Sequence, residues 1–271
     1  MMLNDIVKNL LKEVSGIAEI PANAAFNIRN NSKSEGRHST ENIDIVPKEG
    51  GSGLDIYVKP FTKNENVHIP ALITQDGVSE VVYNDFHIGE GAEIEIIAGC
   101  GIHNCGCDDS VHEGIHRFFL GKNSKVVYIE KHIGEGDGSG KRIINPQTHV
   151  EAEENAYIEM DTVQLKGVDS TKRVSSAKLG PGATIVIKEK IMTHGHQTAE
   201  TSVLLQGISP DSSSAPKSSA TQTATVTPNV MPSSWITAWL RQSPKSLRTM
   251  WMHLWCMRRQ SARLQAISWS S

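Results

Sequence analysis

The stretch HIGEGAEIEIIA, residues 87–98, decides the fold of this chain because its pattern returns three more times. The later copies are FLGKNSKVVYIE (119–130), VEAEENAYIEM (150–160) and KLGPGATIVIKE (178–189). Each copy reads as a turn, then a small residue, then a strand in which apolar and polar residues alternate. The same alternation is present at 54–58, so short β segments are predicted from about residue 54 to residue 206.

The small residues of these copies give the period of the repeat. They are Ala92, Ser124, Ala156 and Ala183, with separations of 32, 32 and 27 residues. A period of this size with one β unit per repeat is typical of a solenoid, in which stacked coils bury a continuous core that one coil cannot form alone. The pattern therefore predicts an all-β core and favours a parallel β-helix over a sandwich, which would lack the repeat.

Two segments before the β core differ from it in pattern. Apolar residues recur at helical spacing from Leu3 to Val14, which predicts a short N-terminal helix over 3–15 with Asn4 as its cap. Residues 28–53 are polar and rich in Gly and Ser, which predicts a loop or linker. We therefore divide the chain into an N-terminal helix and linker (1–53), a β core (54–214) and an atypical tail (215–271).

The charge of the chain changes near residue 212. Residues 1–211 hold 20 Lys and Arg against 30 Asp and Glu, whereas the remainder holds seven basic residues, no acidic residue and all five Trp. An acidic body argues against nucleic acid as a partner. No segment has the pattern of a signal peptide or a membrane span, so we expect a cytoplasmic protein without a membrane partner.

A cluster of Cys and His between residues 99 and 116 is the strongest indication of chemistry. Cytoplasmic thiols stay reduced, and thiolate and imidazole are the ligands that borderline transition metals prefer. The alternative is that these side chains pack inside the coils without a ligand. The candidate metal ligands are Cys100, His103, Cys105, Cys107, His112 and His116.

Two other motifs carry less information. The segment GEGDGSGK (134–141) departs from the phosphate-loop pattern because Glu135 follows the first Gly and Arg142 follows Lys141, so a flexible glycine turn is expected. His194 and His196 alternate in the segment THGH, and a surface or packed role is favoured for them over metal ligation. The same surface or packed role is favoured for His132, in EKHIGEG.

The segment beginning CGIHNCGCDDSVHEGIHRFFLGKN at Cys100, with KHIGEG after it and GPGATIVIKEKIMTHGHQTAETSVLLQGISPDSSS further on, resembles the SufB/SufD family of iron–sulfur cluster assembly. The resemblance implies a right-handed parallel β-helix that acts as a scaffold rather than as an enzyme. It implies a transient iron–sulfur cluster or iron as cargo. It also implies an ABC-type ATPase, a second SufB/SufD-type subunit and sulfur-donor proteins as partners.

Two alternative functions stay open at this point. The chain would be a structural subunit that stabilises its partner without a metal site of its own, or a metal-binding β-rich enzyme of the cupin type. A cupin needs a spaced H-x-H, Glu and His pattern, and only its first element, His194-x-His196, is present.

The tail does not resemble the family. Met and Trp each have one codon, so shifting the frame of MWMHLWCMRRQSARLQAISWSS (250–271) permits VDASLVHEAAIGKIAGDQLVK, a family-like string. Residues 222–233 similarly permit CYGHTECDAI. We therefore interpret the chain after about residue 214 as a frameshifted translation and expect an irregular or poorly ordered segment. The Cys and His that the family carries in this region are absent here, and Cys256 matches neither.

Overall fold

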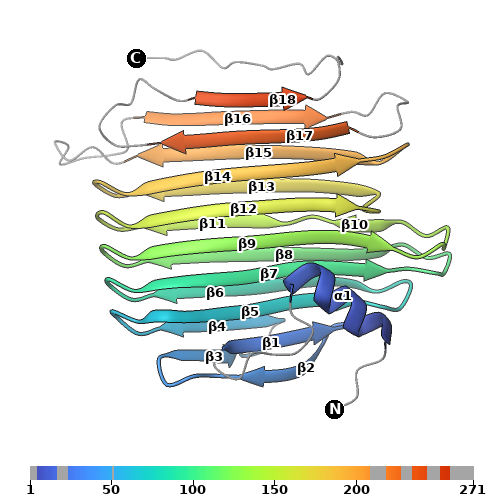
Figure 1. Cartoon of the computed structure of the whole chain (residues 1–271), viewed down its shortest axis with the longest axis horizontal. Coiled ribbons are helices and arrows are strands. Elements are labelled where there is room, and N and C mark those ends of the chain that lie inside the picture. The colour runs from blue at the N-terminus through green and yellow to red at the C-terminus, as the bar shows by residue number, and fades with distance from the viewer. Residues whose placement is uncertain are drawn as a thin grey trace.

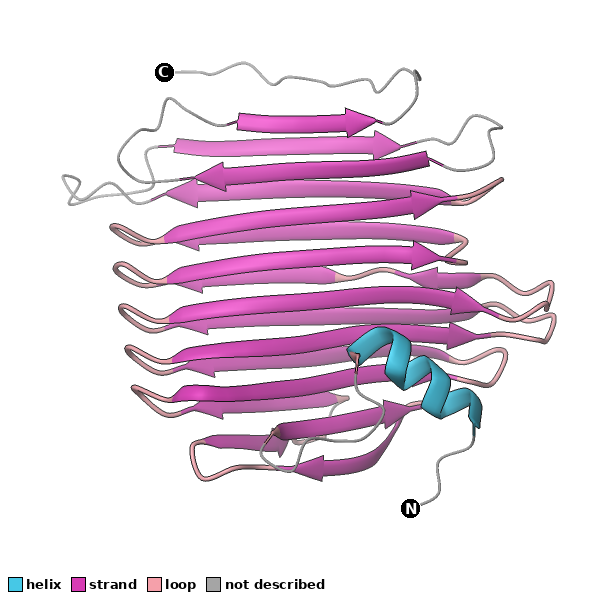
Figure 2. Cartoon of the chain, viewed as in Figure 1, coloured by secondary structure: helices cyan, strands magenta, loops and turns pink. Residues whose placement is uncertain are grey.

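The computed structural model describes residues 5–16, 24–50, 52–207, 218–226, 234–242 and 251–256, with side chains up to residue 206. The chain winds as a right-handed parallel β-helix with one short helix on its outside (Figures 1 and 2), as the sequence predicted. Within the described residues there are two nine-stranded sheets, and each coil contributes a strand to both of them.

Along the first sheet, from one edge to the other, lie β18 (Trp251–Cys256), β17 (Ser234–Gln242), β14 (Thr184–Thr193), β12 (Tyr157–Lys166), β9 (Lys125–Glu135), β7 (Glu93–His103), β5 (Lys63–Ile73), β1 (Ala25–Asn30) and β2 (Lys33–His38). The second sheet contains β16 (Ser218–Val226), β15 (Thr198–Gly207), β13 (Ser170–Leu179), β11 (Gln147–Ala152), β10 (Arg142–Ile144), β8 (Ser110–Leu120), β6 (Ser79–Ile88), β4 (Gly53–Val58) and β3 (Ile43–Pro47). Pairing is parallel from β5 to β14 in the first sheet and from β4 to β15 in the second.

The repeated turn of the sequence closes one side of every coil. The residue before each small residue has a positive φ, as at Gly91 (63°), Asn123 (57°), Asn155 (57°) and Gly182 (74°). The amide of the small residue then donates to the carbonyl three residues earlier, as from Ala92 to Gly89 at 3.2 Å. Gly and Asn tolerate this left-handed conformation. The small side chain that follows is buried and leaves room for the next coil, so the repeated turn allows the coils to stack.

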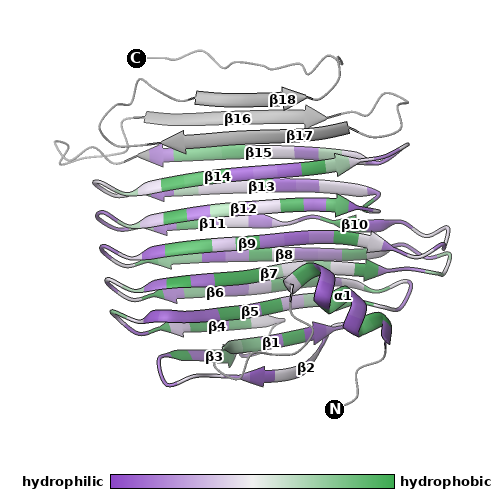
Figure 3. Ribbon diagram, in the orientation of Figure 1, coloured by the Kyte–Doolittle hydropathy of each residue, from purple (hydrophilic) through white to green (hydrophobic). Residues whose placement is uncertain are grey.

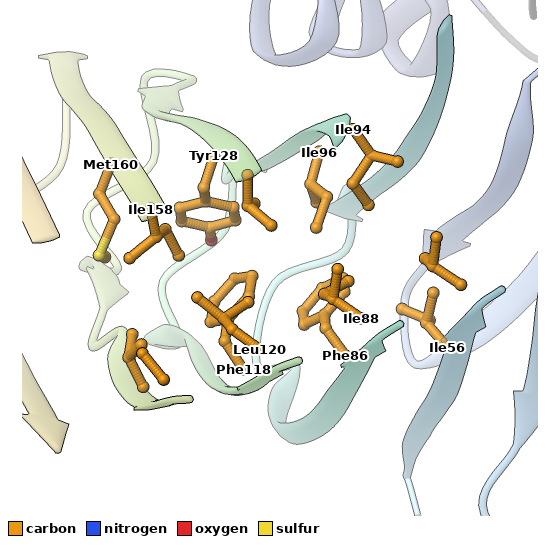
Figure 4. Close-up of a cluster of buried hydrophobic side chains, with 14 of the residues drawn as sticks. Ile56, Phe86, Ile88, Ile94, Ile96, Phe118, Leu120, Tyr128, Ile158 and Met160 are labelled. Atoms are coloured by element: carbon orange, nitrogen blue, oxygen red, sulfur yellow. The ribbon is translucent and has the colours of Figure 1, made fainter. Parts of the chain in front are cut away.

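Stacked apolar side chains fill the half of the interior next to these turns. Strand register aligns Val67, Ile96, Tyr128, Met160 and Ile187 in one column of the first sheet. In the second sheet the rings of Phe86 and Phe118 stack at 4.6 Å. Figure 4 shows these rings facing Tyr128 across the interior, and Figure 3 shows the alternation of polar and apolar residues along the strands. This continuous core is what the repeat predicted.

The predicted N-terminal helix is α1 (Asp5–Ser15), although Asn4 lies outside the described residues. The helix buries Val7, Leu10 and Val14 against the outer face of β5, β7 and β9 (Figure 1). It approaches closely because β7 has Gly99 and Gly101 there, where a Cβ would lie 2.9 Å from Val14 and 3.1 Å from Leu10. In the described part of the chain, no helix has the length and apolar character needed to cross a membrane.

The prediction of a loop or linker over 28–53 is wrong. Strands β1 and β2 form a hairpin, and β3 pairs with β4, so this segment extends both sheets. Its strands are five or six residues long, and β1 and β2 lack the regular alternation that marks the later strands. The parallel coil also rules out the barrel that a cupin requires.

The pairing pattern changes in the tail. Strands β16 and β17 pair antiparallel with the last parallel strands, β15 and β14, and β18 pairs antiparallel with β17. The regular coil therefore ends at residue 207, close to the change in composition. The segments between these strands lie outside the described residues.

Candidate functional site

The interior changes from apolar to polar partway along the strands. In the first sheet, the inward positions two residues beyond the apolar column hold Glu130, Thr162 and Glu189. The inward positions four residues beyond it hold Cys100, His132 and Gln164. All six side chains are buried. Burial of this many polar groups is costly unless they are paired, so this half of the coil is a candidate site.

Gly114 creates a cavity at the centre of the polar half. It lies on β8 between His112 and His116, and period-2 alternation points all three positions inward. A Cβ on Gly114 would lie 3.2 Å from Nε2 of His112 and 3.5 Å from Nε2 of His116. The absent side chain leaves a cavity of about 30 Å³ that is also lined by Cys100 and His132, enough for a water molecule or a single small ion.

Glu80 holds His112 in place. Its Oε1 lies 2.8 Å from Nδ1 of His112, and its Oε2 accepts a 2.9 Å hydrogen bond from Nε of Arg29. Burial alone would raise the pKa of Glu80, but the hydrogen bonds and charges of His112 and Arg29 lower it to about 2. The carboxylate therefore fixes one ring nitrogen of His112 and leaves Nε2 directed at the cavity, as in metal-binding histidines.

His116 is oriented by two other partners. Its Nδ1 lies 2.7 Å from the hydroxyl of Tyr128, and its Nε2 lies 3.3 Å from Nδ2 of Asn84. Burial lowers the pKa of His116 to about 4, so the ring is neutral at pH 7. A neutral imidazole is the form that binds metal ions.

An ionic group forms the next layer of the interior. Arg173 lies between Glu130 and Glu189, with nitrogen–oxygen distances of 2.8 Å to each. Burial opposes ionisation of Glu130, yet Arg173 and His132 hold its pKa well below the usual range. Burial raises the pKa of the Cys100 thiol, and the charges of Glu80 and Glu130 raise it further. The thiol is therefore uncharged beside carboxylates that are paired with Arg29 and Arg173.

The side chains around the cavity are of types that bind iron or a related metal, but their donor atoms are not yet close enough to share one ion. A thiol, three imidazoles and two carboxylates are suitable ligands. Among the described residues, however, three donor atoms come within 4.8 Å of one another only at Asp55, Asp85 and His87, on the outer face. That group is already neutralised, because Lys48 contacts both carboxylates and Arg117 binds Asp85. Ligation in the interior requires side-chain rotation around the cavity.

The predicted ligands fall into two groups. Cys100, His112 and His116 line the cavity. His103, Cys105 and Cys107 lie outside it, at the end of β7 and in the turn that follows, where both thiols are exposed. The sequence cluster is therefore not one site.

The other two motifs are turns. The glycines of 134–141 pack on the turn at 104–108, where Gly138 donates to Asn104 and Gly140 donates to Gly106. His194 and His196 are exposed beside the turn between β14 and β15. The structure gives neither motif a ligand-binding geometry.

Several residues of the site were missed by the sequence analysis, although the repeat contains the signal. Register places side chains 32 residues apart on neighbouring coils, which pairs Cys100 with His132, Glu80 with His112 and Asn84 with His116. Adding the period of the repeat to Cys100 would have identified His132. Arg173 has no such signal, because it meets Glu130 across the interior from the opposite sheet.

Comparison with known proteins agrees with this architecture. Residues 72–220, more than half of the chain, match the family described as SUF system FeS cluster assembly, SufBD core domain. The matched segment includes the four donor residues Cys100, His112, His116 and His132 that line the cavity. A search of curated proteins found no match. The chain therefore belongs to the SufBD core-domain family of the SUF system for iron–sulfur cluster assembly.

Proposed function

We propose that this chain is a scaffold subunit of the SUF machinery that holds iron, sulfide or a partly built iron–sulfur cluster. The single observation that carries the proposal is the group formed by Cys100, His112, His116 and His132 around the cavity, inside the domain that matches the family. The work is ligation and positioning rather than turnover of a substrate, so we propose no enzymatic activity. The protein acts in the cytoplasm.

Partners follow from the family. An ABC-type ATPase is the partner that hydrolyses ATP. A second SufB/SufD-type subunit pairs with this chain, and sulfur-donor proteins deliver sulfur to it. A rigid β-helix suits this role, because hydrogen bonds between its strands hold the ligands in place while partner subunits move.

Anaerobic reconstitution of the reduced protein with ferrous iron and sulfide tests the scaffold function. We expect visible absorbance from a bound cluster, and its loss in Cys100→Ser. His149→Gln is the matched control, because His149 is on the outer face and bonds only Ser176 among the described residues, at 2.7 Å. A paired Cys105→Ser/Cys107→Ser variant tests the surface thiols in the same assay.

The alternative is a structural subunit without a metal site. The buried ion pairs of Glu130, Arg173 and Glu189 are compatible with it, since they complete an interior without any ligand. No absorbance in the unmodified protein, or unchanged absorbance in both Cys variants, would favour this alternative over the scaffold.

A further inference from the structure

We propose that His103, Cys105 and Cys107 form a second metal site, separate from the interior, which takes a thiophilic ion such as Zn²⁺. The site is on the solvent side of the turn between β7 and β8, and both of its thiols are exposed. It does not depend on the scaffold function, because it uses none of the residues that line the cavity.

Two of the donors already have near-ligand geometry. Nε2 of His103 lies 3.1 Å from Sγ of Cys105. Tetrahedral zinc with ordinary Zn–N and Zn–S bonds places such a nitrogen and sulfur about 3.5 Å apart, so a shift of a few tenths of an ångström admits the ion. Among the described residues, Nδ1 of His103 is buried and has no hydrogen-bond partner.

The backbone of the turn is held in place. The buried side chain of Asn104 donates to the carbonyl of Asp108 at 2.8 Å and accepts a 2.9 Å hydrogen bond from the amide of Gly106. The turn at 136–141 stacks on it through Gly138 and Gly140. Cys105 and Cys107 therefore project from a fixed bend. Among the described residues the three donor atoms do not all lie within 4.8 Å of one another, so the exposed Cys107 side chain must move to add the third donor.

Negative charge surrounds the two thiols. The carboxylate of Asp76 packs against Gly106, since a Cβ there would lie 1.9 Å from Oδ2. Asp108 and Asp109 follow Cys107 directly and are exposed. Carboxylates at this position attract a cation, in contrast to the outer Asp55–Asp85–His87 group, where Lys48 and Arg117 already supply positive charge.

Zinc titration of the full chain against a chromophoric chelator tests the site. A Cys256→Ser background removes the one cysteine of the sequence that lies outside the 99–116 cluster. We expect one Zn²⁺ per chain, with affinity reduced by more than about 100-fold in Cys105→Ser and in Cys107→Ser and by about tenfold in His103→Ala. His149→Gln is the control and should bind as the background does, because His149 lies on the outer face away from this turn. Equal melting temperatures without zinc would show that the variants fold.

Thiol alkylation read by mass spectrometry gives an independent result. Zinc should protect Cys105 and Cys107, while buried Cys100 stays unreactive with or without the ion. Unchanged zinc affinity in either Cys variant, or in His103→Ala, would overturn the three-ligand site. This assay uses no iron or sulfide, so its failure would leave the reconstitution result of the scaffold test intact.

Discussion

Nδ1 of His112 lies 2.8 Å from Oε1 of Glu80, a residue one coil earlier and 32 positions back in the sequence. The second carboxylate oxygen of Glu80 binds Arg29 on β1. One buried carboxylate therefore links the polar interior to the N-terminal strands. Glu80 therefore both orients a residue of the candidate site and contributes to the stability of the fold.

Glu80→Gln should destabilise the protein by up to about 3–5 kcal/mol, because it leaves the partly buried charge of Arg29 without its counterion. Urea denaturation measures the loss. The matched control is Glu93→Gln, which breaks an exposed 3.0 Å pair with Lys63 and should cost less than about 1 kcal/mol. Similar losses in the two variants would mean that the Glu80 pair contributes no more to stability than an exposed ion pair.

Gly114→Ala should impair iron binding more than it impairs folding. The new methyl group would lie 3.2 Å from Nε2 of His112 and would occupy the cavity, while the φ of Gly114 is not positive and accepts Ala. We expect a change in unfolding free energy within about 1 kcal/mol, together with weaker iron binding in the reconstitution assay. Gly36→Ala is the control, since a Cβ there meets only the Phe26 ring at 3.6 Å. Normal iron binding by Gly114→Ala would remove the cavity from the site.

Stability should fall on acidification between pH 6.5 and pH 4. The folded pKa of His116 is about 4, below its ordinary 6.5, so in this window the unfolded chain binds a proton that the folded chain does not. The linked loss is on the order of 3 kcal/mol across the window and is absent above pH 6.5. Glu80, with a folded pKa of about 2, adds a further loss below its ordinary 4.5.

Unfolding free energy measured against pH checks this prediction. A His116→Gln variant keeps a polar group at the position but removes the titration, so its stability should vary less between pH 6.5 and pH 4. Equal pH dependence in the variant and the unmodified protein would assign the acid sensitivity to other groups.

Much of the fold was predictable because it depends on short-range patterns. The 32-residue separation of Ala92, Ser124 and Ala156 reports the circumference of a coil, and alternation reports which side chains enter the core. The hairpin of β1 and β2 was missed because its strands are only six residues long and show no regular alternation of buried and exposed residues. Parallel register cannot be read from such short segments, since tertiary pairing decides it.

The site was only partly predictable, for a different reason. Proximity in sequence suggested one cluster from Cys100 to His116, but a strand turns every second side chain to the opposite face, and the next turn carries Cys105 and Cys107 out of the coil. Contacts along the coil axis follow the repeat and were available from it. Contacts across the interior, such as Arg173 with Glu130, depend on how the two sheets face each other.

Substitutions at the positive-φ position of the repeated turn should affect stability according to how well the new residue tolerates positive φ. Asn155 has a φ of 57°, and its amide donates to the carbonyl of Pro181 on the next coil at 2.8 Å. Asn155→Gly should be close to neutral, whereas Asn155→Val should cost about 1–2 kcal/mol because a β-branched residue is strained there. Thermal unfolding of both variants checks this. A Val variant as stable as the Gly variant would show that the turn adapts its backbone.

Resequencing the coding DNA should reveal a shifted reading frame after about residue 214. Parallel pairing stops at β14 and β15, and the next strands along the chain pair antiparallel, at the point where acidic residues disappear from the sequence. The ends of a solenoid need a cap, because the last coil otherwise leaves strand edges and an apolar face exposed. A tail selected for that role should cap the coil better than one translated out of frame, so the in-frame protein should melt at a higher temperature. A gene that reads in frame through this region as printed, or equal melting temperatures for the two proteins, would contradict the frameshift interpretation.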